Sequence, residues 1–224
     1  MSRTIVAAAR GEDAHDAIAL ATMLARTHDA RVLIAGIYVL PIGQHAYGYE
    51  HAAREALRAE LDTLSADVPA DVEFDITMKA ATSPIAGLHE LAEATDAQAI
   101  VLGPSHVGGG TRALRGDVGL HLLHDAPCAI AVAPRGLADA PVVPPDVVGV
   151  AWDDTDEARE ALRLGADIAH RTHARLRLIH VVAPLPVTYD LPHVGDAKYL
   201  AARREVAEGS LREAAELLEI QPPP

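Results

Sequence analysis

Five glycines fall between residues 103 and 116, immediately after a short apolar run. The run, residues 99–102, fits a buried strand, and Gly103 allows the chain to turn sharply as it leaves the sheet. An amphipathic segment at residues 118–123 and a second apolar run at residues 128–133 follow. A glycine-rich loop between a strand and a helix frees backbone N–H groups, and the helix dipole favours negative charge there. This stretch therefore predicts a binding site for an anion such as a phosphate.

Two pairs of histidines have a spacing that could place metal ligands on one helix face. His121 and His124 lie three residues apart, and so do His170 and His173. Neither pair has acidic or cysteine partners at the spacing of a zinc site. His170 and His173 also lie at the end of an expected helix, where the dipole favours positive charge. We therefore expect no metal site.

Ser105, His106 and Asp117 are residue types that can form a hydrolytic triad. The G-x-S-x-G turn that presents such a serine is absent from the sequence. A nucleotide hydrolase or an adenylating enzyme would also need a base or a metal cluster, and neither can be identified. The sequence therefore favours a binding protein, with no catalytic residues, over an enzyme.

The composition excludes several classes of protein. The chain has 224 residues, half of them hydrophobic, and a formal net charge of −13. An acidic chain without a basic run cannot replace the counterions of a nucleic acid. It has no run of about 18 apolar residues and no apolar N-terminal segment of signal-peptide length. Its single cysteine, Cys128, lies in an apolar run and is interpreted as a core residue. We expect a cytoplasmic protein with no nucleic-acid partner and no membrane partner.

Apolar runs alternate with amphipathic stretches through the first 135 residues. Strands are expected at residues 4–9, 32–40, 72–78, 99–102 and 128–133, and helices at residues 13–28, 50–64 and 83–94. Ser83 opens the third helix, and Pro84 suits its first turn. Alternation of this kind implies an α/β fold with a parallel sheet and right-handed crossovers.

Residues 147–182 repeat the pattern of residues 4–39, with a strand, a helix, a histidine-containing helix end and a strand at the same spacing. Such self-similarity indicates an internal duplication. A further helix is expected at residues 198–218, and no second glycine-rich loop follows it. We therefore divide the chain into a first unit at residues 1–135, a proline-rich linker at 136–146 and a partial second copy at 147–224.

The partial second copy is expected to have two strands, at residues 149–152 and 176–182, without the strands that would flank them. Two strands with two helices are marginally stable alone, and open apolar edges invite pairing with another chain. We therefore expect a homodimer.

The glycine-rich loop resembles the phosphate loop of the universal stress protein family, which is written G-x2-G-x9-G-[ST]. Gly103 and Gly116 match the first and third glycines. His106 stands in place of the second glycine, and Asp117 in place of the serine or threonine. The resemblance implies an open parallel five-stranded sheet of order 3-2-1-4-5 with helices on both faces. It also implies ATP or another adenine nucleotide as the ligand, with magnesium only alongside the nucleotide.

By the resemblance, five residues would surround the phosphates and the ribose: Gly103, His106, Gly116, Asp117 and Val118. In the family, an aspartate at the end of the first strand holds the adenine. The second copy has this residue as Asp153, and the first copy has Ala9 at the equivalent position. In the family, a His-Val pair usually ends the second strand, and Ile37 stands in place of its valine.

Asp117 disfavours a bound phosphate. A carboxylate about 4 Å from a phosphate charge costs roughly 1 kcal/mol in water and about 4 kcal/mol in a partly buried site. Aspartate is also a favoured N-cap, which accepts the amide hydrogens that a phosphate would otherwise take. We therefore expect a stress-response or regulatory protein whose adenine-nucleotide site, in the first unit, is degraded. The alternative is a dimeric regulatory or interaction protein of the same fold that acts without a nucleotide.

Overall fold

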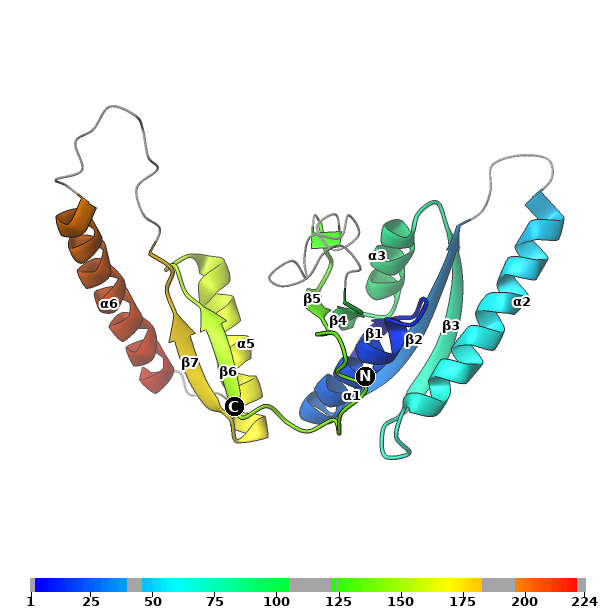
Figure 1. Cartoon of the computed structure of the whole chain (residues 1–224), viewed down its shortest axis with the longest axis horizontal. Helices are drawn as coiled ribbons and strands as arrows, with labels where there is room; N and C mark the ends of the chain where they lie inside the picture. Colours follow the sequence, from blue (N-terminus) through cyan, green and yellow to red (C-terminus); the bar gives the residue numbers. More distant parts are fainter. Residues whose placement is uncertain (1–2, 40–45, 105–121, 124, 183–195, 221–224) are drawn as a thin grey trace, which may run out of the picture. The chain divides into compact units, whose positions relative to one another are not determined.

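The computed structural model describes residues 3–39, 46–104, 122–123, 125–182 and 196–220. The chain forms two compact units, Met1–Val143 and Pro144–Pro224 (Figure 1). Each unit contains a parallel sheet. Residues 136–143, which the sequence assigns to a linker, belong to the first unit.

The first unit is built on a five-stranded sheet in which neighbouring strands are parallel. Its strands are β1 (Arg3–Ala8), β2 (Ala30–Val39), β3 (Phe74–Ala81), β4 (Ala97–Leu102) and β5 (Ala129–Val132). They lie in the order β3-β2-β1-β4-β5. This order confirms the α/β fold and the 3-2-1-4-5 topology that the sequence predicts.

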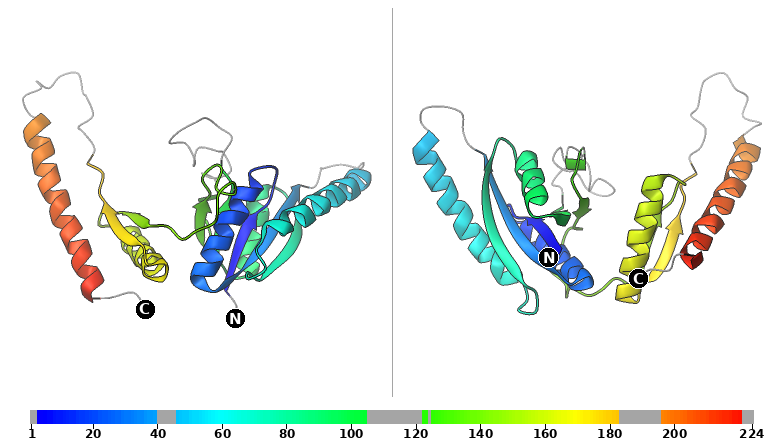
Figure 2. Two further views of the ribbon diagram at one scale, coloured as in Figure 1. Left: turned by 60° about the horizontal axis from the view of Figure 1, so that its bottom comes forward. Right: turned by 180° about the vertical axis from the view of Figure 1, so that it is seen from behind.

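The helices described in the first unit are α1 (Ala14–His28), α2 (Ala46–Leu64), the 3-10 helix η1 (Ser65–Asp67) and α3 (Pro84–Ala94). Consecutive side chains of a strand point to opposite faces of the sheet. Ile5 and Ala7 of β1 are therefore buried in one core with Ile18 of α1. Val6 is buried in a second core with Leu88 of α3. Helices thus cover both faces of the sheet, as predicted (Figure 2).

The start of α3 agrees with the sequence. Ser83 Oγ accepts a hydrogen bond from Ala86 N at 3.1 Å, and Pro84 occupies the first turn, where its missing N–H is not needed. Two other starts differ from those predicted. β3 begins at Phe74, because Val72 N donates to Pro69 O in a turn that precedes the strand.

The start of α2 is at Ala46, four residues before the start that the sequence predicts.

In the second unit, the strand expected to reach residue 182 ends at Ile179. It ends there because Ile179 pairs with Ala151, the last residue of the neighbouring strand. A strand without a partner cannot continue its ladder of hydrogen bonds.

The second unit has the elements β6 (Val147–Ala151), α5 (Asp156–Thr172), β7 (Arg175–Ile179) and α6 (Asp196–Ile220). β6 and β7 form a parallel two-stranded sheet. Their core contains Trp152 with Leu162 of α5 and Ala214 of α6. Trp152, the only tryptophan in the chain, is 2% exposed, and its Nε1 donates to Ser210 Oγ at 2.8 Å. The indole therefore reports on the packing of α6 against the end of β6.

Two helical glycines allow a matched test of packing in the second unit. A Cβ added to Gly165 of α5 would lie 2.3 Å from Val150 Cγ2, whereas a Cβ added to Gly209 of α6 would meet nothing within 4 Å. Gly165→Ala is expected to destabilise the unit by about 1–3 kcal/mol through overpacking. Gly209→Ala is expected to be neutral or to stabilise it by up to about 1 kcal/mol, because alanine has the higher helix propensity. Urea unfolding followed by Trp152 fluorescence measures the free energy of unfolding of both variants. Equal changes in this free energy would contradict the close contact of α5 with β6.

Candidate functional site

The carboxyl ends of β1 and β4 lie next to each other, because these strands are neighbours in the parallel sheet. Ala7 pairs with Val101. Ala9 lies two residues after Ala7, and Gly103 lies two residues after Val101. Ala9 is 3% exposed, and its N–H donates to Ala35 O at 2.9 Å. In open α/β sheets, ligands bind at the carboxyl rim where the strand order reverses, which here is between β1 and β4. The structure thus brings together Ala9 and Gly103, two of the predicted site residues.

Gly103 lies against the start of α1. A Cβ added to Gly103 would be 2.2 Å from the carbonyl oxygen of Asp13, the residue that precedes the helix. Only glycine permits so close an approach of two backbone segments. The chain leaving β4 therefore passes directly beside the N-terminus of α1, close to both the backbone and the Cβ of Asp13.

A residue of α2 holds the loop between β1 and α1. Gly11 N donates to Glu60 Oε1 at 2.6 Å. The two residues are 49 positions apart in the sequence, so no local motif indicates the contact. Glu60 is a residue near the rim that the sequence analysis did not select.

Ile37 lies on β2, two residues beyond Ala35, whose carbonyl accepts the hydrogen bond from Ala9. A Cβ added to Gly87 of α3 would lie 2.7 Å from Ile37 Cγ2, so the two residues are in contact. Ile37 also packs against the core on the α3 face of the sheet. In the part of the chain that the structure describes, Ile37 therefore supplies apolar contacts to α3.

The other predicted site residues lie outside the described residues: His106, Gly116, Asp117 and Val118. Ser105, His121 and His124 lie outside them as well. The phosphate loop therefore stays a prediction from the sequence.

The end of β6 carries an acidic residue that stabilises the next helix. Asp153 Oδ1 accepts hydrogen bonds from Thr155 Oγ1 at 2.7 Å and from Thr155 N at 3.3 Å. These hydrogen bonds hold the pKa of the Asp153 carboxyl below its ordinary value. Thr155 is the N-cap of α5, and its Oγ1 accepts from Ala158 N at 3.2 Å. Asp153 therefore orients the capping residue.

The strand register shows which residue of the first unit corresponds to Asp153. Ala9 lies one residue beyond the last paired residue of β1, and its N–H donates to β2 at 2.9 Å. Trp152 lies one residue beyond the last paired residue of β6, and its N–H donates to β7 at 2.8 Å. Trp152 is therefore the residue equivalent to Ala9. The sequence-based alignment of Ala9 with Asp153 is wrong by one residue, and the equivalent of Asp153 is the exposed Arg10.

The described residues contain no group of three or more histidine, cysteine, aspartate or glutamate side chains placed to hold a metal ion. His170 lies in the last turn of α5, and His173 is its C-cap, with a left-handed φ of 57°. Both histidines therefore lie where the helix dipole favours a positive charge.

Cys128 is partly buried at the start of β5. Burial raises the pKa of its thiol, which disfavours the reactive thiolate. Across the described ranges, the helices are too short or too polar to span a bilayer.

Thr155→Val tests the hydrogen bonds to Asp153, because valine keeps the shape of threonine but lacks its hydroxyl. The pKa of the Asp153 carboxyl is expected to rise toward its ordinary value. In the native chain, the lowered pKa contributes stability above the ordinary aspartate pKa, and this contribution is lost as the pH falls through the folded-state pKa. Loss of the N-cap is also expected to cost about 1 kcal/mol of stability at neutral pH.

NMR titration of the carboxyl carbons measures the pKa of Asp153 in both proteins. Asp71, whose pKa is lowered mainly by its hydrogen bond from Arg26, serves as the internal control. An Asp153 pKa that is the same in both proteins would show that Thr155 does not control its titration.

Several solved structures are similar to this chain. A universal stress protein from Archaeoglobus fulgidus DSM 4304 has 16% identity and a TM-score of 0.67, with 93% of this chain and 75% of that chain covered. A member of the family from Burkholderia pseudomallei has 24% identity and a TM-score of 0.49, with 58% and 95% covered. The universal stress protein from Archaeoglobus fulgidus in complex with dAMP has 19% identity and a TM-score of 0.43, with 60% and 98% covered. No match was found among curated proteins.

The universal stress protein family itself matches residues 1–134 and 145–223. These two segments together span most of both compact units. The five-stranded sheet of the first unit also has the strand order that the glycine-rich loop led us to expect. The chain therefore belongs to the universal stress protein family.

Proposed function

We propose that this chain is a stress-response or regulatory protein that binds an adenine nucleotide of the ATP type, weakly, at the carboxyl rim of β1 and β4. One observation carries the proposal: Gly103 follows β4 in direct contact with the backbone of Asp13, beside the end of β1. Because residue 103 has no side chain, the chain that leaves β4 can pass close to the N-terminus of α1, where an anion is favoured. Any magnesium enters with the phosphates of the nucleotide.

The binding is weak in this proposal because the rim lacks an acid to hold the base. Arg10 occupies the position that Asp153 has in the second unit. Glu12 and Asp13 follow it and add negative charge near the phosphate side. A carboxylate about 4 Å from a phosphate opposes binding by roughly 1 to 4 kcal/mol, depending on burial. The proposal assigns ligand binding to this rim and no catalytic step.

The sheet of the second unit favours a second function. Among the described residues, this sheet consists of two strands, β6 and β7. Ile179 of β7 is 45% exposed, although strands of this kind are normally covered. In this alternative, the chain acts as a homodimer that pairs through the open edges of β6 and β7, without a nucleotide. Pairing of edges supplies the hydrogen bonds that an isolated two-stranded sheet lacks.

Equilibrium titration of the full chain with fluorescently labelled ATP tests the first function. We expect saturable binding with a Kd between about 10 μM and 1 mM, with competition by unlabelled ATP. Absence of binding at about 1 mM nucleotide would contradict it.

Arg10→Asp places an acid where the second unit has Asp153 and is expected to tighten binding of adenosine about tenfold, the size of one charge-assisted hydrogen bond. Arg3→Asp makes the same charge change at the start of β1 and is expected to have no effect.

Multi-angle light scattering tests the dimer. Ile179→Lys places a charge on β7 and is expected to convert the dimer to a monomer. Leu164→Lys on α5 is the matched control, because Leu164 is also 45% exposed, and this variant is expected to remain dimeric. A monodisperse monomer of the unmodified chain at micromolar concentration would contradict the pairing of edges.

A further inference from the structure

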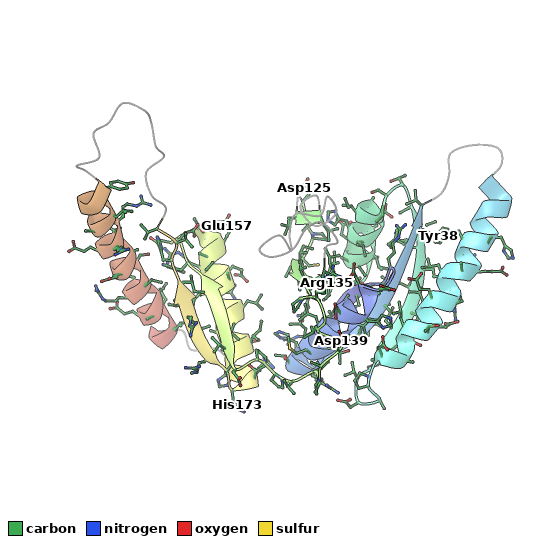
Figure 3. All side chains as sticks on the ribbon, viewed as in Figure 1. Tyr38, Asp125, Arg135, Asp139, Glu157 and His173 are labelled. Atoms are coloured by element: carbon green, nitrogen blue, oxygen red, sulfur yellow. The ribbon has the colours of Figure 1, made fainter. Side chains whose placement is uncertain are left out.

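The sheet of the second unit has its core on one face. Val150 of β6 and Leu176 and Leu178 of β7 pack there with residues of α5 and α6. Glu157 and His173, which Figure 3 labels, lie at the start and at the end of α5. Because side chains of a strand alternate between the two faces of a sheet, the residues between these apolar ones point to the opposite face.

The opposite face is open to solvent among the described residues of this unit. Five exposed residues make up this open face: Gly149 and Ala151 of β6, and Arg175, Arg177 and Ile179 of β7. A Cβ added to Gly149 would lie 3.3 Å from Ile179 Cδ1, so the isoleucine lies over the glycine. The open face therefore has an apolar part along β6 and at the end of β7, and a basic part at the start of β7.

The register gives the open face a counterpart in the first unit. Gly149 corresponds to Val6 of β1, because each lies two residues before the last paired residue of its strand. Val6 pairs with Leu33 on β2. Gly149 pairs with Arg177 on β7, so Arg177 corresponds to Leu33. Val6 and Leu33 are buried in the core that contains Leu88 of α3. The same face of the sheet therefore carries a helix in the first unit and an exposed arginine in the second.

The two arginines of the open face are unpaired. Arg175, two residues before Arg177, corresponds to Arg31 of β2. Arg31 Nη1 donates to Asp75 Oδ2 of β3 at 2.7 Å. Within the described residues, neither Arg175 nor Arg177 has a side-chain ion pair or hydrogen bond. Two guanidinium groups thus lie on one face of a strand without the carboxylate that their counterpart meets, in a chain of net charge −13.

An arginine in place of a buried leucine restricts what this face can receive. An entirely apolar helix would bury the charge of Arg177 without a partner, which is strongly unfavourable. A carboxylate forms charge-assisted hydrogen bonds with a guanidinium group, often two in parallel. A second copy of the chain, bound face to face about a two-fold axis, would bring four arginines into one interface. The charge therefore favours an acidic partner of a different kind.

α3 shows how a helix can occupy such a face and meet a basic strand residue at the same time. Leu88, Leu91 and Ala92 belong to the core between α3 and the sheet. Glu90 Oε2 lies 2.9 Å from Lys79 Nζ of β3. A helix with apolar residues on one side and carboxylates beside them is therefore complementary to a face that is part apolar and part basic.

We propose that the open face binds an amphipathic helix of a partner protein whose carboxylates flank an apolar stripe. The carboxylates pair with Arg175 and Arg177. The apolar stripe lies on Gly149, Ala151 and Ile179, where the small residues of β6 let a helix approach the strands closely. The proposal concerns the face of the sheet, and it depends neither on a nucleotide nor on pairing of the edges of β6 and β7.

Titration of the full chain with a synthetic peptide tests the proposal. The probe is an amphipathic peptide of about 20 residues, long enough to form a helix, with leucines on one side and glutamates on both flanks. We expect one saturable site with a Kd of about 1–100 μM. Far-ultraviolet circular dichroism is expected to show a gain of helix on binding. The same peptide with lysine in place of every glutamate is expected not to bind.

Two double variants with equal loss of charge locate the site. Arg175→Gln with Arg177→Gln is expected to weaken binding of the glutamate peptide about tenfold, the combined effect of two partly exposed ion pairs. Arg203→Gln with Arg204→Gln removes the same charge from exposed positions of α6, a helix that packs against the other face, and is expected to leave the affinity unchanged. All four side chains are exposed, so both variants are expected to keep the melting temperature of the unmodified chain.

Equal loss of affinity in the two double variants would overturn the proposal, because it would show only general attraction to positive charge. Absence of saturable binding, or equal affinity for the glutamate and lysine peptides, would overturn it as well. Binding without a gain of helix would show a strand added to an edge and would overturn the helical partner. Light scattering is expected to give the same mass for the variant of Arg175 and Arg177 as for the unmodified chain. A change in mass would assign the open face to a second copy and overturn the proposal.

Discussion

Burial of β1 on both of its faces is the constraint on which the first unit depends. Ile5 and Ala7 enter one core and Val6 enters the other, so both faces need a covering helix and both edges need a strand. The chain meets this demand by placing β2 on one side of β1 and β4 on the other. The strand order then reverses at β1, and the ends of β1 and β4 meet at one rim. The candidate nucleotide site is thus a consequence of how the core is built.

The two units differ in the size of the residue directly after the first strand. In the first unit this residue is Ala9, a small buried residue beside the end of β4. In the second unit it is Trp152, whose indole fills the core and is hydrogen-bonded to Ser210 of α6. The acid that follows, Asp153, is engaged with Thr155 at the start of α5. The same backbone hydrogen bond therefore belongs to a small buried residue in one unit and to a large buried residue in the other.

The alternation of apolar and polar residues was sufficient to predict the order of elements and a parallel sheet, and the resemblance of the glycine-rich loop to a known family supplied the strand order of the first sheet. Ser83 with Pro84 likewise marks the start of α3 by a local rule. Contacts between distant segments could not be predicted this way, because a strand or helix pattern does not show which carboxylate will meet which amide. Glu60 with Gly11 and Asp16 with Gly136 are such contacts. The misplaced equivalence of Ala9 arose because the register at the end of a strand is set by hydrogen bonds rather than by residue type.

The hydrogen bonds of Asp16 have a practical consequence for dividing this protein into fragments. A fragment cut after β5, at residue 134, would retain every strand of the five-stranded sheet but would lose the chain that donates both hydrogen bonds to Asp16, from Gly136 N and Ala138 N. Water would replace two hydrogen bonds that are shielded in the intact unit, so such a fragment would be less stable than the strand pattern suggests. A fragment that ends at Val143 keeps these donors and preserves the whole first unit for separate study.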